Sequence, residues 1–312
     1  MLERAGTGPH ERALLIELVR CPSCGAAMAV DQNRVVCEGG SHRFPIVEGV
    51  LVLIEDRELA HNPQYDHQRA YFDAEFARYS AYRPDPWRIS YLRRLRAWSV
   101  LGTPDEPLID VGVGGSGHTV IEAARLGAPA VGCDLSLAGL VVARRFAAAQ
   151  GVEDRTLWVC CSAEKLPFAA AAFGSALAIA VIEHVPNDEA ALRELARVLR
   201  PGGRAWVTVP HTLANIAPIF RLSNRRHDVR LGHLRRYEVE SLVEMARRVG
   251  LEPLEVQFTG HAIKVLQLVA GKVLPGSVGR RFWWWCEARD LHRSQAKRGS
   301  MQLSVVFSRN GR

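Results

Sequence analysis

Short apolar runs alternate with amphipathic segments along the last two thirds of the chain. The apolar runs have the length of buried strands, and the segments between them repeat their apolar residues at helical spacing. We expect strands at Pro107–Val111, Ala130–Cys133, Thr156–Cys160, Ser175–Ala180, Arg204–Val209, Leu254–Thr259 and Leu303–Arg309. We expect helices between them at Thr119–Leu126, Ala138–Ala149, Asp188–Val198 and Glu238–Val249. This alternation predicts an α/β domain with a doubly wound, seven-stranded, mostly parallel sheet, and a ligand crevice at the carboxyl ends of its strands.

Composition narrows the class of protein. The chain has 312 residues, of which 48% are hydrophobic and 23% charged, and these are ordinary values for a soluble globular protein. No uncharged apolar run reaches about 18 residues, so we expect no stable membrane insertion. Acidic residues interrupt the N-terminal apolar residues, which argues against a secretory signal. The seven cysteines do not suggest a disulfide scaffold, and we expect a reducing, cytoplasmic location.

A net charge of +7 leaves two interpretations open. One is a solvated basic surface, and the other is an anionic partner such as RNA. Basic residues gather in Arg88–Arg96 and Arg221–Arg236. The sequence does not decide the oligomeric state.

A glycine-rich segment directly follows the first expected strand, which contains Asp110. Its glycines are Gly112, Gly114, Gly115 and Gly117. Glycines at such a point allow a tight turn and a close approach of the backbone to a ligand, but the motif alone is weak evidence. The second expected strand runs into Asp134, where a carboxylate can accept both hydroxyls of a ribose. Together these features predict a cofactor that contains a nucleoside.

Three further segments follow in a fixed order: Ala163–Phe168, the turn Ile182–Pro186 and the turn Val198–Arg204. With the acidic glycine loop and the second strand, this order resembles the class I S-adenosylmethionine-dependent methyltransferases, in particular their broad type-11 group. The resemblance covers about residues 105–260. It implies a Rossmann-like domain, S-adenosylmethionine as cofactor and methyltransferase activity. Dinucleotide dehydrogenases share the first two features but not the downstream set.

The resemblance also implies roles for single residues. Asp110 would orient the methionine end of the cofactor, and the glycines would let the loop pass beneath it. Asp134 would hold the ribose hydroxyls. The remaining contacts would come from Leu135 on the adenine, Ser162 and Ala163 at its edge, and Ala180 on the floor of the site.

Two departures from the family pattern stand out. The loop is one residue longer than the common version, so Gly115 or Gly117 takes the place of the third glycine. Ser162 stands where many relatives have an aspartate.

Methyl transfer from a sulfonium needs an aligned nucleophile, and a hydroxyl nucleophile benefits from a base. The candidate bases are His184, His211 and His233. Each of them can also be a structural histidine. Some ubiquinone O-methyltransferases bind a divalent ion through an extra acid before the Glu-His pair, and Ala180–Ile182 lack that acid. We therefore expect no catalytic metal.

Cysteines with metal-ligand spacing lie near the N-terminus. The set is Cys21, Cys24, Cys37 and His42. Three thiolates and an imidazole match a closed tetrahedral structural zinc site. The same order of zinc ribbon and methyltransferase occurs in bacterial ribosomal-RNA guanine methyltransferases, which keeps RNA open as a substrate.

We divide the chain into three parts. Residues 1–56 form an N-terminal helix and zinc ribbon, and residues 57–104 form a helical lid or connector. Residues 105–312 form the methyltransferase domain, with a helical insertion at about 261–300 that contains the aromatic run Phe282–Trp285. We expect methyl transfer to a small-molecule or glycan acceptor, at oxygen. The alternatives are an rRNA or tRNA base methyltransferase and a non-catalytic protein that binds the cofactor or a partner chain.

Overall fold

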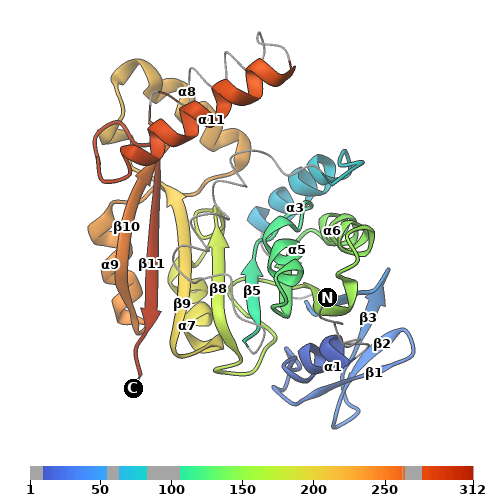
Figure 1. Ribbon diagram of the computed structural model, residues 1–312. Helices are drawn as coiled ribbons and strands as arrows, with labels where there is room; N and C mark the ends of the chain where they lie inside the picture. Colours follow the sequence, from blue (N-terminus) through green and yellow to red (C-terminus); the bar gives the residue numbers. More distant parts are fainter. Residues whose placement is uncertain (1–9, 55–62, 83–105, 262, 264–275, 312) are drawn as a thin grey trace, which may run out of the picture.

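The computed structural model describes residues 10–54, 63–82, 106–261, 263 and 276–311. Four short strands come first: β1 Met28–Asp31, β2 Arg34–Cys37, β3 Arg43–Val47 and β4 Val50–Val52. Seven more follow: β5 Leu108–Val111, β6 Ala130–Asp134, β7 Thr156–Cys160, β8 Phe173–Ile179, β9 Leu199–Pro210, β10 Leu251–Thr259 and β11 Gln302–Arg309. Within the described residues they form one eleven-stranded sheet in the order β1-β2-β3-β4-β7-β6-β5-β8-β9-β11-β10 (Figure 1).

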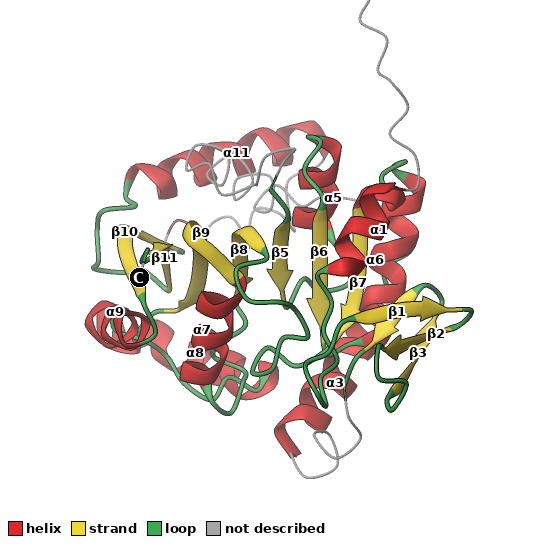
Figure 2. Cartoon of the chain, turned by 90° about the horizontal axis from the view of Figure 1, so that it is seen from below, coloured by secondary structure: helices red, strands yellow, loops and turns green. Residues whose placement is uncertain are grey.

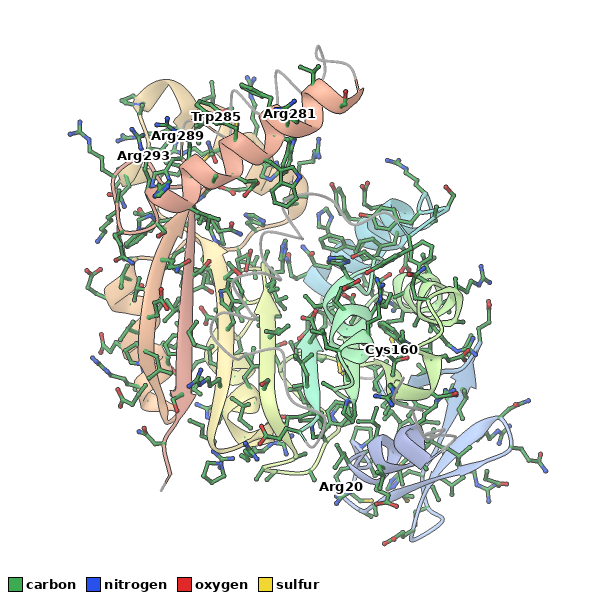
Figure 3. The ribbon with its side chains drawn as sticks, in the orientation of Figure 1. Arg20, Cys160, Arg281, Trp285, Arg289 and Arg293 are labelled. Atoms are coloured by element: carbon green, nitrogen blue, oxygen red, sulfur yellow. The ribbon has the colours of Figure 1, made fainter. Side chains whose placement is uncertain are left out.

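The expected seven-stranded sheet is therefore wrong in its strand number. The seven expected strands lie side by side, but β4 extends them by pairing parallel with β7. Val52 of β4 stands opposite Cys160 of β7, which Figure 3 labels. Without β4, the backbone groups along the outer side of β7 would face solvent unpaired. Strands β3, β2 and β1 continue from β4 as antiparallel neighbours. At the other end of the sheet, β11 and then β10 continue from β9 as antiparallel neighbours. The sheet is thus parallel only in its centre.

Four helices lie where the amphipathic pattern predicts them. They are α5 His118–Arg125, α6 Leu137–Ala149, α7 Asp188–Val198 and α9 Val239–Arg248. In Figure 2, α7 and α9 cover one face of the sheet, and α5 and α6 lie toward the other. Successive residues of β5 serve both faces, because side chains alternate along a strand: Leu108 packs in the cluster with α5 and α6, and Ile109 in the cluster with α7 and α9.

The N-terminal helix α1 spans His10–Glu17. Its chain continues as two isolated β-bridges, Val19 with Phe168 and Arg20 with Ala27. Val19 is fully buried in the core cluster of the main sheet. The N-terminal region is thus packed against the main sheet as well as paired with it.

The remaining helices are α3 Pro63–Phe76, α8 Pro218–Leu231 and α11 Gly276–His292, with short 3-10 turns at η1 Glu153–Arg155 and η2 Leu213–Asn215. Helix α3 falls in the expected lid, and α11 falls in the expected insertion. The basic segment Arg88–Arg96 and residues 264–275 lie outside the described residues. Helix α8 is not predicted from the sequence, because its described side chains are exposed or half-buried and it has no apolar stripe.

Candidate functional site

A cavity of about 440 Å³ opens at the carboxyl ends of β5, β6 and β8. This volume is in the range of small-molecule sites. One wall is the glycine loop after β5, and the floor is formed by the ends of β6 and β8. Helix α3 covers the cavity with Tyr65, Gln68, Arg69, Tyr71, Phe72, Glu75 and Phe76. The position agrees with the crevice expected for a doubly wound sheet.

The glycine loop needs its glycines for two different reasons. Gly112, Gly114 and Gly117 have left-handed φ angles of 71°, 66° and 55°, a region that favours glycine. Gly115 does not, but a Cβ atom on it would lie 2.6 Å from Cβ of Phe76 on α3. The third left-handed position of the longer loop is thus Gly117, which caps the start of α5.

Asp134 ties the glycine loop to the end of β6. One carboxylate oxygen accepts a hydrogen bond from the amide of Gly114 and the other from the amide of Ser136, both at 2.9 Å. Burial raises the pKa of Asp134, while these two amide bonds oppose the shift. Because the carboxylate also lines the cavity, its remaining lone pairs can accept hydrogen bonds from a ligand.

Of the expected cofactor residues, Gly115, Gly117 and Ser162 do not line the cavity, and the others do. Asp110, Leu135, Ala163 and Ala180 line the cavity, and the Asp110 carboxylate accepts a hydrogen bond from the Thr119 hydroxyl. Ser162 is buried just outside the cavity lining, with its hydroxyl 3.1 Å from the hydroxyl of Tyr65.

Ala180 has a φ of 56°, which is unusual for a residue with a side chain. Such backbone strain gathers at functional sites. It lies here at the point where β8 meets the cavity floor.

Of the three candidate histidines, His184 lines the cavity. It is packed edge-on against Phe72, and burial lowers its pKa to about 3, with neighbouring His233 contributing in the same direction. The side chain is therefore neutral near pH 7. Within the described residues its buried Nδ1 atom has no hydrogen-bond partner, and the burial that keeps the ring neutral also makes it a weak base.

Two further ionisable groups lie directly behind His184. Glu183 and His233 offer ligand or proton-accepting atoms that all lie within 4.8 Å of one another and of His184. Glu183 is fully buried, and burial raises its pKa to about 8. His233 is oriented by Asp228, whose Oδ1 atom lies 2.9 Å from Nδ1. This cluster can share a proton or hold a cation, and our expectation of no catalytic metal stays a prediction.

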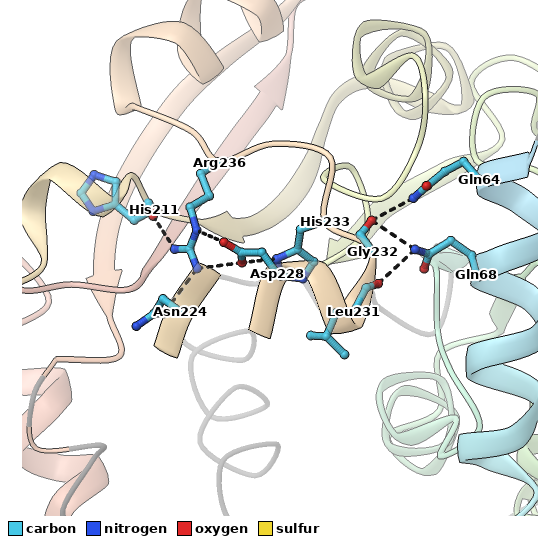
Figure 4. Close-up of polar contacts among 9 residues, drawn as sticks. All are labelled: Gln64, Gln68, His211, Asn224, Asp228, Leu231, Gly232, His233 and Arg236. Atoms are coloured by element: carbon cyan, nitrogen blue, oxygen red, sulfur yellow. Dashed lines mark hydrogen bonds and ion pairs between the residues drawn. The ribbon is translucent and has the colours of Figure 1, made fainter. Parts of the chain in front are cut away.

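His211 lies elsewhere. It is buried beside β11, with Nδ1 2.6 Å from the Ser300 hydroxyl and Nε2 3.2 Å from the Asn215 amide, and it does not line the cavity. Its backbone carbonyl accepts a hydrogen bond from Arg236, which also pairs with Asp228 (Figure 4). The structure thus connects His211 and His233 through Arg236 but does not bring His211 to the cavity.

Two glutamines that are not predicted from the sequence hold α3 over the cavity. Gln64 donates to the carbonyls of Gly232 and His184, at 2.8 and 3.2 Å. Gln68 donates to the carbonyl of Leu231 at 3.0 Å, and Figure 4 shows both side chains reaching this turn. Two glutamines four residues apart give no specific signal in a sequence, because their partners are backbone atoms about 120 to 170 residues away.

At the N-terminus the four expected metal ligands are brought together. The sulfur and imidazole atoms of Cys21, Cys24, Cys37 and His42 lie within 4.8 Å of one another. A turn with Gly25 at a φ of 74° returns the chain to Cys21. The hydrogen bond from the His42 amide lowers the pKa of Cys37 to about 6, which favours the thiolate form that binds metals. The donor set fits a structural zinc ion.

Comparison with known proteins agrees with this geometry. A family model described as a methyltransferase domain matches residues 109–207. The fold is similar to that of geranyl diphosphate C-methyltransferase from Streptomyces coelicolor A3(2). The TM-score is 0.57 and the identity 16%, over 80% of this chain and 99% of that chain. The chain has the fold of the class I S-adenosylmethionine-dependent methyltransferases. The fold is also similar to that of the [4+2]-cyclase SpnF, with a TM-score of 0.55 and 20% identity over 79% of this chain and 96% of that chain.

Curated relatives are similar to part of the chain. Methyltransferase GfsG of Streptomyces halstedii is 37% identical over 113 residues, which is 35% of this chain and 41% of that protein. The ubiquinone biosynthesis O-methyltransferase of Parvibaculum lavamentivorans is 36% identical over 137 residues, 41% of this chain and 53% of that protein. The chain thus spans about half the length of these two relatives.

Proposed function

We propose that the protein transfers a methyl group from S-adenosylmethionine to a small-molecule or glycan acceptor, at oxygen. One observation carries the proposal: a single cavity joins the glycine loop and Asp134 to a buried neutral histidine, His184. The glycine loop and Asp134 provide a place for the cofactor, and the histidine provides a hydrogen-bond acceptor for the nucleophile. The name of the ubiquinone biosynthesis O-methyltransferase supports methylation of a small molecule at oxygen, and the name of GfsG supports methyl transfer. The fold alone does not decide the activity, since a cyclase shares it.

The cofactor half of the cavity lies between β5 and β6. Asp134 would accept the ribose hydroxyls, and Gly112 and Gly114 would let the backbone approach the ligand. The rest of the set would be Asp110, Gly115, Gly117, Leu135, Ser162, Ala163 and Ala180. When bound, S-adenosylmethionine supplies an activated methyl group on a sulfonium.

The acceptor half lies under α3. The aromatic rings of Tyr71 and Phe72 line it and exclude water, which favours an apolar or aromatic acceptor. His184, which burial keeps neutral near pH 7, would accept a hydrogen bond from the acceptor hydroxyl during methyl transfer. Its lowered pKa makes it a weak base, so full proton transfer needs an acidic hydroxyl such as that of a phenol. His233 would act behind it as a positioning residue. His211, remote from the cavity, is the weakest of the three candidates.

Calorimetric titration with S-adenosylmethionine tests the cofactor half. We expect Asp134→Ala to weaken binding about 10- to 100-fold, since hydrogen bonds to a charged group contribute about 1.5–3 kcal/mol. Asp154→Ala is the matched control, because it removes an exposed carboxylate from η1. Equal affinity of the wild type and Asp134→Ala would overturn the cofactor assignment.

Methyl incorporation from labelled cofactor tests the acceptor half. Phenolic and quinol compounds would be offered in parallel with ribosomal and transfer RNA. We expect label in small molecules, and His184→Gln should lower the rate while leaving cofactor affinity intact. Label in RNA would favour the alternative of an RNA methyltransferase, and cofactor binding without any transfer would favour the non-catalytic one.

We also propose a structural zinc ion held by Cys21, Cys24, Cys37 and His42. The four donors are the right number and kind, and the chain between them forms two short antiparallel strands, β1 and β2, with few buried side chains. A metal would supply the folding free energy that so small a core lacks. The three-part division of the chain also stays a proposal.

A further inference from the structure

Helix α11 presents a row of large side chains to solvent. Arg281, Trp285 and Arg289 follow one another at four-residue spacing, and Arg293 follows directly after the helix. Figure 3 shows the four along α11, at the end of the molecule toward which the arrowheads of β8 and β9 point. Residues four apart lie on one side of a helix. The row thus forms a ridge, which we call the arginine ridge, and it is about 18 Å long at 1.5 Å per residue.

The arginine ridge has no acidic residue among its exposed positions. Both acids of α11 are turned inward, and Glu287 and Asp290 are 5% and 1% exposed. Asp290 is occupied there by hydrogen bonds from the amides of Gly260 and His261. The three arginines of the arginine ridge make no ion pair among the residues that the structure describes. The ridge therefore carries three positive charges without local neutralisation.

Arginines on α7 and α9 are neutralised. Arg193 on α7 pairs with Glu189 at 2.9 Å, and Arg248 on α9 pairs with the same carboxylate at 3.0 Å. Arg247 pairs with Glu252 at 3.1 Å. Arg225 and Arg226 on α8 also make no ion pair among the described residues, so unpaired arginines occur on α8 and α11 but not on α7 and α9.

Apolar surface accompanies these charges. Trp285 is 48% exposed and Val278, one turn before Arg281, is 56% exposed. The Arg289 guanidinium lies over the Trp285 ring, 5.2 Å from its centroid. A half-exposed tryptophan among arginines is typical of helices that lie in the headgroup region of a bilayer, because the ring has an apolar body and a polar tip.

We propose that the arginine ridge of α11 binds the surface of an anionic membrane. Arg281, Arg289 and Arg293 contact lipid phosphates, and Trp285 enters the boundary between headgroups and acyl chains. This is peripheral binding: no helix in the described part of the chain is long and apolar enough to cross a bilayer. Docking of this kind does not depend on the proposed methyl transfer.

Co-sedimentation with lipid vesicles tests the proposal. The vesicles are pure phosphatidylcholine, or phosphatidylcholine with 30 mol% phosphatidylglycerol. We expect binding to the anionic vesicles only, weakened by salt. The triple variant Arg281→Gln, Arg289→Gln and Arg293→Gln should bind about a hundredfold more weakly, because each basic residue contributes about 1 kcal/mol near such a surface.

The matched control removes three paired arginines instead, as Arg193→Gln, Arg247→Gln and Arg248→Gln. It has the same net charge as the ridge variant, so it should keep most of the vesicle affinity. Equal loss in both variants would overturn the proposal, since net charge alone would then explain binding. Ridge-dependent binding to a labelled RNA hairpin without vesicle binding would also overturn it.

The variant Trp285→Ala separates insertion from simple charge attraction. It should weaken vesicle binding while leaving the three arginines in place, and unchanged binding would remove the tryptophan from the proposal. Titration with S-adenosylmethionine should give the same affinity for all variants. A failure of the cofactor assignment and a failure of membrane docking are thus distinguished by separate measurements.

Discussion

Gly117 offers a sharp test of how the cofactor loop is joined to the core. A Cβ atom at this position would lie 2.6 Å from the ring of Trp158 and 2.8 Å from Cβ of Ala143. Both neighbours are buried, and Trp158 is 1% exposed, so neither has room to withdraw. The backbone there also has a φ of 55°. Gly117→Ala therefore combines left-handed strain with overpacking.

The expected loss in free energy of unfolding is about 2–4 kcal/mol. Left-handed strain contributes about 1 kcal/mol and overpacking about 1–3 kcal/mol. The matched control is Gly151→Ala, at a φ of 69° but with no atom within 4 Å of the added Cβ, which should cost only about 1 kcal/mol. Urea unfolding followed by tryptophan fluorescence measures both variants. If Gly117→Ala costs no more than Gly151→Ala, packing against Trp158 is not the reason for this glycine.

Two further predictions concern the ends of the molecule. Burial lowers the pKa of His261, but hydrogen bonds to Asp290 and to a backbone carbonyl outweigh it, so the net pKa is raised above 6.5. The pair then contributes its full stability below pH 6.5 and loses it as pH rises through the folded-state pKa. Asp290→Asn should lower the free energy of unfolding by about 1–3 kcal/mol at pH 6 and by less at pH 8.5, and an equal loss at both pH values in urea unfolding would contradict this. For the zinc site, elemental analysis of the purified protein should find about one zinc ion per chain, and Cys21→Ser with Cys24→Ser should abolish it and lower the melting temperature; a variant that melts like the wild type would speak against a structural metal.

The sequence by itself predicted the elements whose signal is local. Helix α7 spans Asp188–Val198 as expected, because a periodic apolar stripe and an Asn187 cap define it within one segment. The left-handed glycines after β5 follow equally from local backbone chemistry. The start of β9 was harder to predict. The Pro201–Gly203 turn pattern suggested a later start than Leu199, where the strand begins.

Only the tertiary structure decided features that join distant segments. β4 is three residues long, and nothing in it specifies β7, more than 100 residues away, as its parallel partner. Likewise, the sequence offered three candidates for the catalytic base: His184, His211 and His233. Folding put His184 in the cavity wall, His233 behind it and His211 against β11. Long-range pairing and burial depend on the summed packing of many elements, and no single stretch of sequence records that sum.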